Sequence, residues 1–137
     1  RYSLPRIAAA PIDVDFHHLD AEHLPFEADR FDTVVSTFTL CSIPDVAHAL
    51  REIRRVLKPG GQFLFLEHGR SPDPGVARWQ DRLNSAWMPL AGGCHLNRPT
   101  RELVAGAGLE VGPVRNYYLK RAPRFVGYMT EGFALKQ

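Results

Sequence analysis

The sequence is poor in cysteine, holds no long apolar run and carries almost no excess of charge. Its two cysteines, Cys41 and Cys94, are too few for a disulfide scaffold and fit a reducing, cytoplasmic setting. No apolar run approaches the roughly 20 residues of a membrane-spanning helix, and no secretory signal segment is present. The formal net charge of +2 does not suggest a dedicated nucleic-acid binder, because such proteins concentrate basic residues on one surface. We therefore expect no nucleic acid as a partner and no membrane segment in this chain.

What the sequence does contain is typical of one globular domain. Hydrophobic residues make up 45% and charged residues 23% of the 137 residues, which excludes a disordered, collagen-like or coiled-coil chain. Apolar–polar alternation over 12–20 predicts a strand, and the β-branched run 31–40 predicts a buried parallel strand. A helix is expected to open at 42–45 and to stop at Pro59, and a second buried strand is expected at 63–66.

The remaining chain continues the alternation of helices and strands. Helices are expected at about 76–88 and 100–107, and two antiparallel strands at about 109–119 and 125–135. Residues 1–10 are expected to be the frayed end of a helix or a linker. The sequence therefore predicts an α/β fold with a parallel centre and an antiparallel edge.

Ligands of open α/β sheets bind beyond the carboxyl ends of the parallel strands, and three candidates lie there. Asp20 could accept a hydrogen bond from an adenine amine while the next backbone N–H donates to the ring, or it could merely cap its own turn. The hydroxyls of Thr37 and Thr39 could face a ligand or bond to the backbone. Glu67 and His68 could orient a substrate or take a proton, or serve as structural hydrogen-bonding groups.

Other polar residues give weaker signals. Cys94 and His95 are adjacent, which is not the spacing of a metal site, so no metal is expected. The thiol of Cys41 is interpreted as a packing group. The basic residues of the first long helix could bind a phosphate, but Glu52 interrupts them and we interpret them as a solvated face: Arg51, Arg54, Arg55 and Lys58.

Taken together, four segments resemble the class I S-adenosylmethionine-dependent methyltransferases, in the branch that includes ubiquinone/menaquinone-biosynthesis enzymes. They are 20–26 (DAEHLPF), 31–35 (FDTVV), 40–43 (LCSI) and 49–61 (ALREIRRVLKPGG). The following part resembles the methyltransferase-like thiol methyltransferases through 66–68 (LEH), Trp79, Trp87, Gly93, Cys94 and 96–98 (LNR). The resemblance implies a Rossmann-like sheet and S-adenosylmethionine as cofactor.

The resemblance also implies roles for individual residues. The residue matching Asp20 binds the adenine amine, the one matching Ala21 contacts the ring through its backbone, and the one matching Thr37 lines the methionine end of the cofactor. Glu67 and His68 fall where the family meets its substrate and are our candidates for the catalytic base. The implied function is methyl transfer to a small-molecule acceptor (thiol, quinol or amine). A non-catalytic remnant that serves as an interaction domain is the alternative.

One departure from the family pattern concerns the first part of the domain. The family begins with a strand, a glycine-rich loop, a helix and a second strand, and no such glycine cluster precedes residue 60. The chain also opens at Arg1. We therefore expect residues 1–137 to be the C-terminal two-thirds of a single methyltransferase domain, with the first two strands missing and the N-terminal half as the missing partner. On this expectation, the strand at 12–20 would have no neighbour, and the chain alone would not bind the cofactor tightly.

Overall fold

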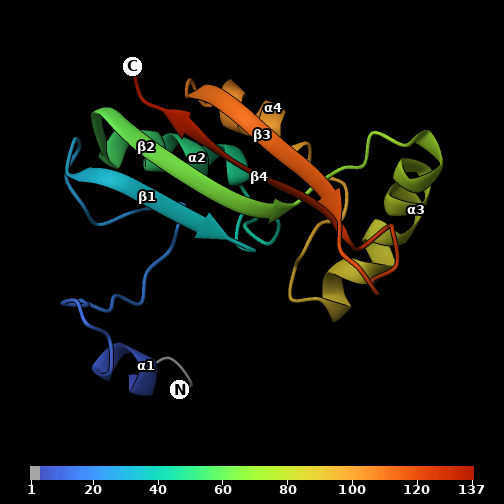
Figure 1. The fold of residues 1–137 in the computed structure, drawn as a ribbon, viewed down its shortest axis with the longest axis horizontal. Coiled ribbons are helices and arrows are strands. Elements are labelled where there is room, and N and C mark those ends of the chain that lie inside the picture. The colour runs from blue at the N-terminus through green and yellow to red at the C-terminus, as the bar shows by residue number, and fades with distance from the viewer. Residues whose placement is uncertain (1–3) are drawn as a thin grey trace.

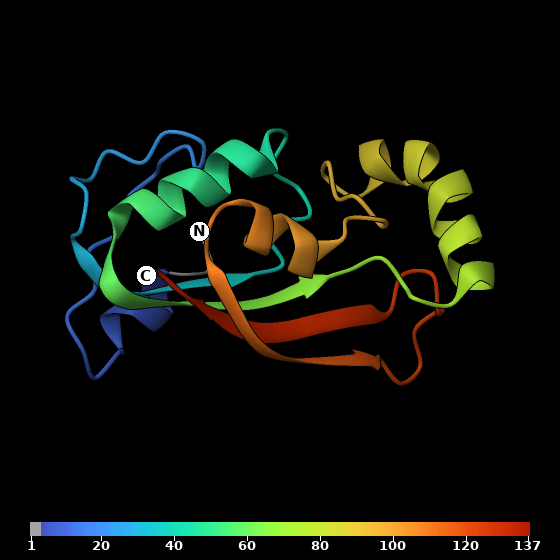
Figure 2. The same ribbon diagram turned by 90° about the horizontal axis from the view of Figure 1, so that it is seen from above.

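The computed structural model describes residues 4–137 as a four-stranded sheet with helices above one face and beyond one end (Figures 1 and 2). The elements in chain order are α1 (Leu4–Ala8), β1 (Phe31–Thr37), α2 (Val46–Val56), β2 (Leu57–His68), α3 (Pro74–Leu90), α4 (Thr100–Gly106), β3 (Glu110–Tyr118) and β4 (Tyr128–Leu135). The expected helix end at 1–10 corresponds to α1, and residues 1–3 lie outside the described residues.

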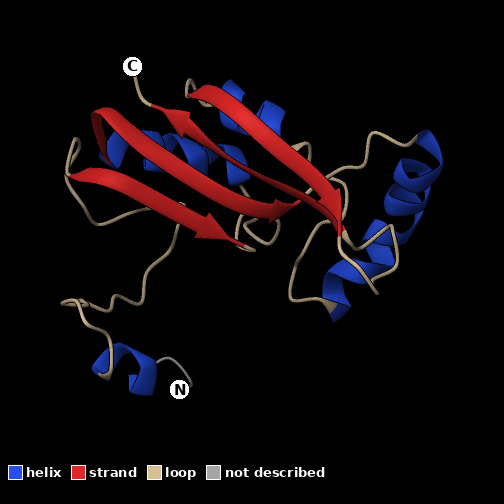
Figure 3. Ribbon diagram, in the orientation of Figure 1, coloured by secondary structure: helices blue, strands red, loops and turns tan. Residues whose placement is uncertain are grey.

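The strands lie in the order β1-β2-β4-β3 (Figure 3). β1 and β2 are parallel, whereas β4 is antiparallel to both β2 and β3. The predicted α/β class, with its parallel pair and its antiparallel hairpin, is thus confirmed. Because β1 and β2 are parallel and joined through α2, their carboxyl ends lie at the same edge of the sheet.

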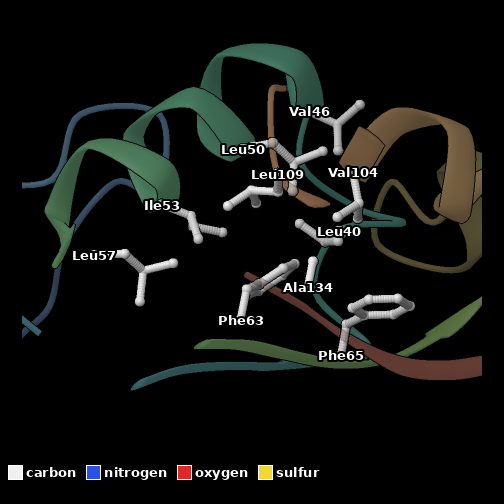
Figure 4. Close-up of a cluster of buried hydrophobic side chains, with 10 residues drawn as sticks. All are labelled: Leu40, Val46, Leu50, Ile53, Leu57, Phe63, Phe65, Val104, Leu109 and Ala134. Atoms are coloured by element: carbon white, nitrogen blue, oxygen red, sulfur yellow. The ribbon is translucent and has the colours of Figure 1, made fainter. Parts of the chain in front are cut away.

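Helix α2 forms the core together with one face of the sheet. Asp45 caps the helix by accepting a hydrogen bond from the backbone N–H of His48 at 2.9 Å. The apolar side chains of α2 recur at helical spacing and pack over the sheet beside α4 (Figure 4). The core cluster consists of Leu40, Val46, Leu50, Ile53, Leu57, Phe63, Phe65, Val104, Leu109 and Ala134.

The opposite face of the sheet is open among the described residues. α2 and α4 lie on one side of the sheet, and α1 lies away from it (Figures 1 and 2). On the open side, the exposed fractions of Val35 and Leu64 are 64% and 37%. These side chains and Phe133 line a shallow hollow of about 450 Å³. We call this surface the open face.

The strand expected at 12–20 is absent, which corrects the prediction. Residues 13–20 have no regular secondary structure, and Ile12 and Phe16 are 72% and 59% exposed. Alternation describes only which side chains share a face of a strand. A strand also needs a neighbour for its backbone N–H and C=O groups, and no described strand lies beside this segment.

Candidate functional site

The carboxyl ends of β1 and β2 bring two of the three predicted groups together. Thr37 pairs with Leu66 in the parallel ladder, so the loop after Thr37 lies beside Glu67 and His68. The hydroxyl of Thr39 donates to the carbonyl of Thr37 at 2.9 Å, which is the backbone-bonding alternative for that side chain. Thr37 itself is exposed and lines the hollow on the open face, where it is available to a ligand.

Glu67 is completely buried and holds the loop after β1. Its Oε1 accepts a hydrogen bond from the Ser36 hydroxyl at 2.7 Å. The backbone N–H of Thr39 donates to both carboxylate oxygens, at 3.1 and 3.0 Å. A buried carboxylate needs such donors, and here they fix the position of the loop. The structural role predicted for Glu67 is therefore present, and its catalytic role stays a prediction.

Phe38 was not singled out from the sequence, although it lies at the centre of this edge. Its φ of 50° places the backbone in the left-handed region, which a bulky residue rarely adopts. The strained turn is held by the N–H of Phe38, which donates to the carbonyl of Leu66 at 3.0 Å. The ring is half exposed and meets the His68 ring edge-on, with 5.3 Å between ring centroids. The sequence Thr37-Phe38-Thr39 contains no glycine or asparagine, so nothing in it predicts a left-handed turn.

His68 is a partly buried imidazole at the end of β2. Burial lowers the pKa of His68 below its ordinary value of 6.5, and the charge of Glu67 offsets this only in part. The ring is therefore neutral at neutral pH and can accept a proton. The Sγ of Cys94 lies 4.0 Å from its Nδ1. The hydroxyl of Thr100 donates to the backbone carbonyl of His68 at 3.1 Å and helps fix this position.

Arg98 connects the loop before α4 to the loop before α2. Its guanidinium donates to the carbonyl of Leu40 and, at 3.4 Å, to the carbonyl of Pro44. Cys41 lies in the same loop, and burial raises the pKa of its thiol to about 12. That thiol stays protonated and unreactive, in agreement with its interpretation as a packing group. Among residues 4–137, no cluster of three potential metal ligands is found.

Asp20 lies in a turn and bonds to that turn. Its Oδ1 accepts a hydrogen bond from the N–H of Glu22 at 2.9 Å, and its Oδ2 lies 3.2 Å from the Nδ1 of His23. The backbone bond, followed by the bond to His23, lowers the pKa of Asp20. The carboxylate is exposed. Because a carboxylate oxygen can accept more than one hydrogen bond, both oxygens could still accept one from a ligand. The capping alternative is thus present, and adenine binding by Asp20 and by the half-buried Ala21 stays a prediction.

The Asp20 turn is attached to α2 by Glu52 and by Arg55, which we had interpreted as part of a solvated face. Glu52 and Arg55 form an ion pair at 2.7 Å. Glu52 accepts the N–H of Leu24 at 3.0 Å, and Arg55 donates to the carbonyls of Phe26 at 2.8 Å and Leu24 at 3.0 Å. For Arg55 the solvated-face interpretation is wrong, because the segment that packs beside it is irregular and was invisible to a periodicity argument.

A further bond brings the Asp20 turn to the candidate edge. The Oε1 of Glu22 accepts the N–H of Asp45 at 2.8 Å. Asp45 caps the start of α2, which follows directly on the loop after β1. The turn that contains Asp20 is thus bonded to the start of α2, whereas Thr37, Glu67 and His68 lie at the carboxyl ends of β1 and β2 themselves.

Comparison with known proteins agrees with this geometry. Residues 3–65 match the family model described as "Methyltransferase domain". The chain is 42% identical over 80 residues to the ubiquinone/menaquinone biosynthesis C-methyltransferase UbiE of Ectopseudomonas mendocina, a match that covers 58% of this chain and 31% of that protein. It is 44% identical over 70 residues to the thiol S-methyltransferase TMT1B of Rattus norvegicus, which covers 50% of this chain and 29% of that protein. The chain is a homologue of the class I S-adenosylmethionine-dependent methyltransferases.

Comparison with solved structures extends the likeness in fold over nearly all of this homologous chain. A proposed methyltransferase from Bacillus halodurans C-125 superimposes with a TM-score of 0.79 at 17% identity, covering 98% of this chain and 76% of that one. At this identity the likeness concerns the fold alone. The matched stretch spans less than a third of the two sequence relatives. In the described part of this methyltransferase homologue, no helix combines the length and apolar character that a membrane crossing requires.

Proposed function

We propose that the chain takes part in S-adenosylmethionine-dependent methyl transfer to a small-molecule acceptor: a thiol, a quinol or an amine. The observation that carries the proposal is the edge at which Thr37, Phe38 and His68 lie together. A hydroxyl, a displayed aromatic ring and a neutral imidazole at the ends of two parallel strands suit a polar cofactor and a partly apolar acceptor. Family membership supports the reaction class but leaves the acceptor open.

The residues present fit the cofactor chemically. Asp20 has an exposed carboxylate with a lowered pKa, which can accept from an exocyclic amine, and Ala21 follows it. Thr37 places an accessible hydroxyl at the end of β1, toward the open face. S-adenosylmethionine, when bound, supplies an electrophilic methyl group on a sulfonium. Asp20 and Ala21 would hold the adenine, and Thr37 would contact the methionine end.

The chain's own contribution to the chemistry is to orient the acceptor and to move one proton. The ring of Phe38 packs edge-on against His68 and shields that side of the imidazole. His68, neutral at neutral pH, takes the proton of an acceptor hydroxyl or amine at whichever ring nitrogen faces it. Glu67 is the other candidate base. Because its oxygens are occupied by Ser36 and Thr39, it can act only if those bonds are released.

We further propose that residues 1–137 form the C-terminal two-thirds of a single methyltransferase domain. Two features support this. The open face exposes Val35 and Leu64, and the β1 edge has no neighbouring strand among residues 4–137. Additional strands beside β1 and cover over the open face would bury both. The same apolar surface also suits the alternative, a non-catalytic interaction domain.

The test is calorimetric titration of S-adenosylmethionine into the complete natural protein that contains these residues. Asp20→Ala should weaken binding, because it removes the proposed acceptor for the adenine amine. Asp13→Ala, a change of the same type at another exposed position, should not. Equal affinities for the two variants would contradict the adenine assignment, and an absence of binding to the unaltered protein would favour the interaction domain.

A further inference from the structure

Helix α3 packs on the rest of the chain through one side only. Gln80 is buried on that side, where its Nε2 donates to the carbonyls of Gly69 at 3.1 Å and Phe125 at 3.2 Å. Its Oε1 accepts the N–H of Ser71 at 2.9 Å, and Ala77 is the other buried residue of the helix. Figure 1 shows α3 beyond the end of the sheet, beside the loop that joins β3 to β4. The opposite side of α3 therefore faces outward.

The outward side of α3 is an apolar stripe. Positions that are four, three and four residues apart share one face of a helix, and here all are apolar: Trp79, Leu83, Ala86 and Leu90. Trp79 and Leu90 are 56% and 86% exposed. Together with Trp87, the lower part of the stripe and Phe125 line a hollow of about 220 Å³ that has only apolar residues around it. Such a row of exposed apolar side chains indicates an interaction surface. We call the stripe, Trp87 and Phe125 the α3 surface.

Trp87 is a second indication that the α3 surface lacks a partner. Its Nε1 is the one buried side-chain nitrogen or oxygen without a hydrogen-bond partner among residues 4–137. Buried N–H groups nearly always have an acceptor. Both tryptophans of the sequence lie on this surface, and tryptophan is enriched at membrane–water interfaces, where the ring is among apolar chains and the N–H meets oxygen acceptors.

The charges that flank the α3 surface are mainly positive. The loop segment 119–126 holds three basic residues and no acidic one. In this loop, Arg124 pairs with Asp73 at 3.4 Å. The acidic residue of α3, Asp81, is already paired with Arg70. Four exposed basic residues form no ion pair among residues 4–137: Arg78, Arg82, Lys120 and Arg121. The complementary surface is therefore apolar in its centre and negatively charged around it.

We propose that the α3 surface docks the protein on an anionic membrane. The apolar stripe lies among the lipid chains just below the headgroups, and the flanking basic side chains meet the headgroup charges, as in amphipathic helices that lie in the plane of a bilayer. A second copy of the chain suits this surface less well, because it would bring two sets of unpaired arginines together. The proposal does not depend on the methyltransferase proposal, since no residue assigned to methyl transfer lies on the α3 surface.

The test is cosedimentation of the complete natural protein with lipid vesicles. We expect binding to phosphatidylcholine vesicles that contain about one-third phosphatidylglycerol to be at least about tenfold tighter than binding to phosphatidylcholine alone. Added salt should weaken the binding, because it screens the attraction between the basic side chains and the headgroups.

Variants of exposed residues locate the contact. Leu90→Gln should weaken binding to the anionic vesicles about tenfold, because a leucine side chain no longer leaves water on docking. Arg82→Gln should weaken it about fivefold by removing one charge near the headgroups. Arg51→Gln removes the same charge from an exposed position on α2 and should leave the affinity unaltered.

Three results would each overturn the proposal. The first is an absence of binding to the anionic vesicles, and the second is equal binding to the neutral ones. The third is an unaltered affinity in both Leu90→Gln and Arg82→Gln. A dimer of the unaltered protein that dissociates in Leu90→Gln would assign the α3 surface to a second copy instead and would overturn the proposal as well.

Discussion

The two faces of the sheet differ in what covers them, although both carry apolar side chains. On one face, Leu50 and Phe63 are completely buried between α2 and the strands. On the other, Val35 of β1 and Leu64 of β2, the residue next to Phe63, remain exposed. Strands with apolar residues on both faces are typical of parallel sheets that are covered on both sides. The comparison supports a longer domain whose remaining part covers the open face.

The largest expected effect is on the covered face. Leu50→Ala removes a completely buried side chain from the core cluster. It should lower the free energy of unfolding by about 2–5 kcal/mol through lost burial and a residual cavity. Urea denaturation followed by circular dichroism measures the change. A loss below about 1 kcal/mol would mean that α2 does not form the core described above.

The buried carboxylate on the covered side should come next. Glu67→Ala leaves the Ser36 hydroxyl and the Thr39 N–H without their acceptor, and should destabilise the chain by about 1–3 kcal/mol. Glu67→Gln retains one acceptor oxygen and should be milder. Comparing the two by the same denaturation separates the loss of an acceptor from the loss of a charge. Equal stability of both variants and the unaltered chain would contradict the structural role of Glu67.

The attachment of the Asp20 turn should respond to pH. The bond to Arg55 lowers the pKa of Glu52 from its ordinary 4.5 to about 2. A lowered carboxyl pKa adds stability that is fully present above pH 4.5 and is lost as the pH falls toward about 2. Unfolding free energies measured across this range should decline less in Glu52→Gln than in the unaltered chain. Parallel declines would show that the pair contributes nothing.

The smallest effect is expected on the open face. Leu64→Ala should change the stability of residues 1–137 by less than about 1 kcal/mol, because the side chain is 37% exposed and no helix packs over it. In the complete domain we expect the same change to cost several times more. Equal small effects in both proteins would mean that the open face stays uncovered, which would contradict the proposed longer domain.

The spacing of apolar residues along the sequence predicted the helices and strands that it can reveal. The helical spacing of Leu50 and Ile53 identified α2, and the β-branched run through Val34 and Val35 identified β1. The segment that contains Phe16 alternates in the same way but forms no strand, because a strand depends on a neighbour that no local pattern describes. The same limitation applies to Arg55, whose carbonyl partners lie 29 and 31 residues away.

For the candidate site, the sequence predicted where the residues lie along the strands, but not which groups they contact. Strand ends located Thr37, Glu67 and His68 correctly, because parallel strands that flank one helix must share an edge. The left-handed turn at Phe38 and the bond from Thr39 to Glu67 depend on tertiary contacts, which residue spacing does not predict. The roles assigned to Asp20 and Ala21 came from the family resemblance and stay predictions.

The central claim is that residues 1–137 carry one part of a cofactor site whose remainder lies beyond them. Calorimetric titration of S-adenosylmethionine into this chain alone tests it most directly. We expect no measurable binding, because the open face beside Thr37 lacks its cover. Saturable binding in the micromolar range would contradict the claim and would place the whole cofactor site within this chain.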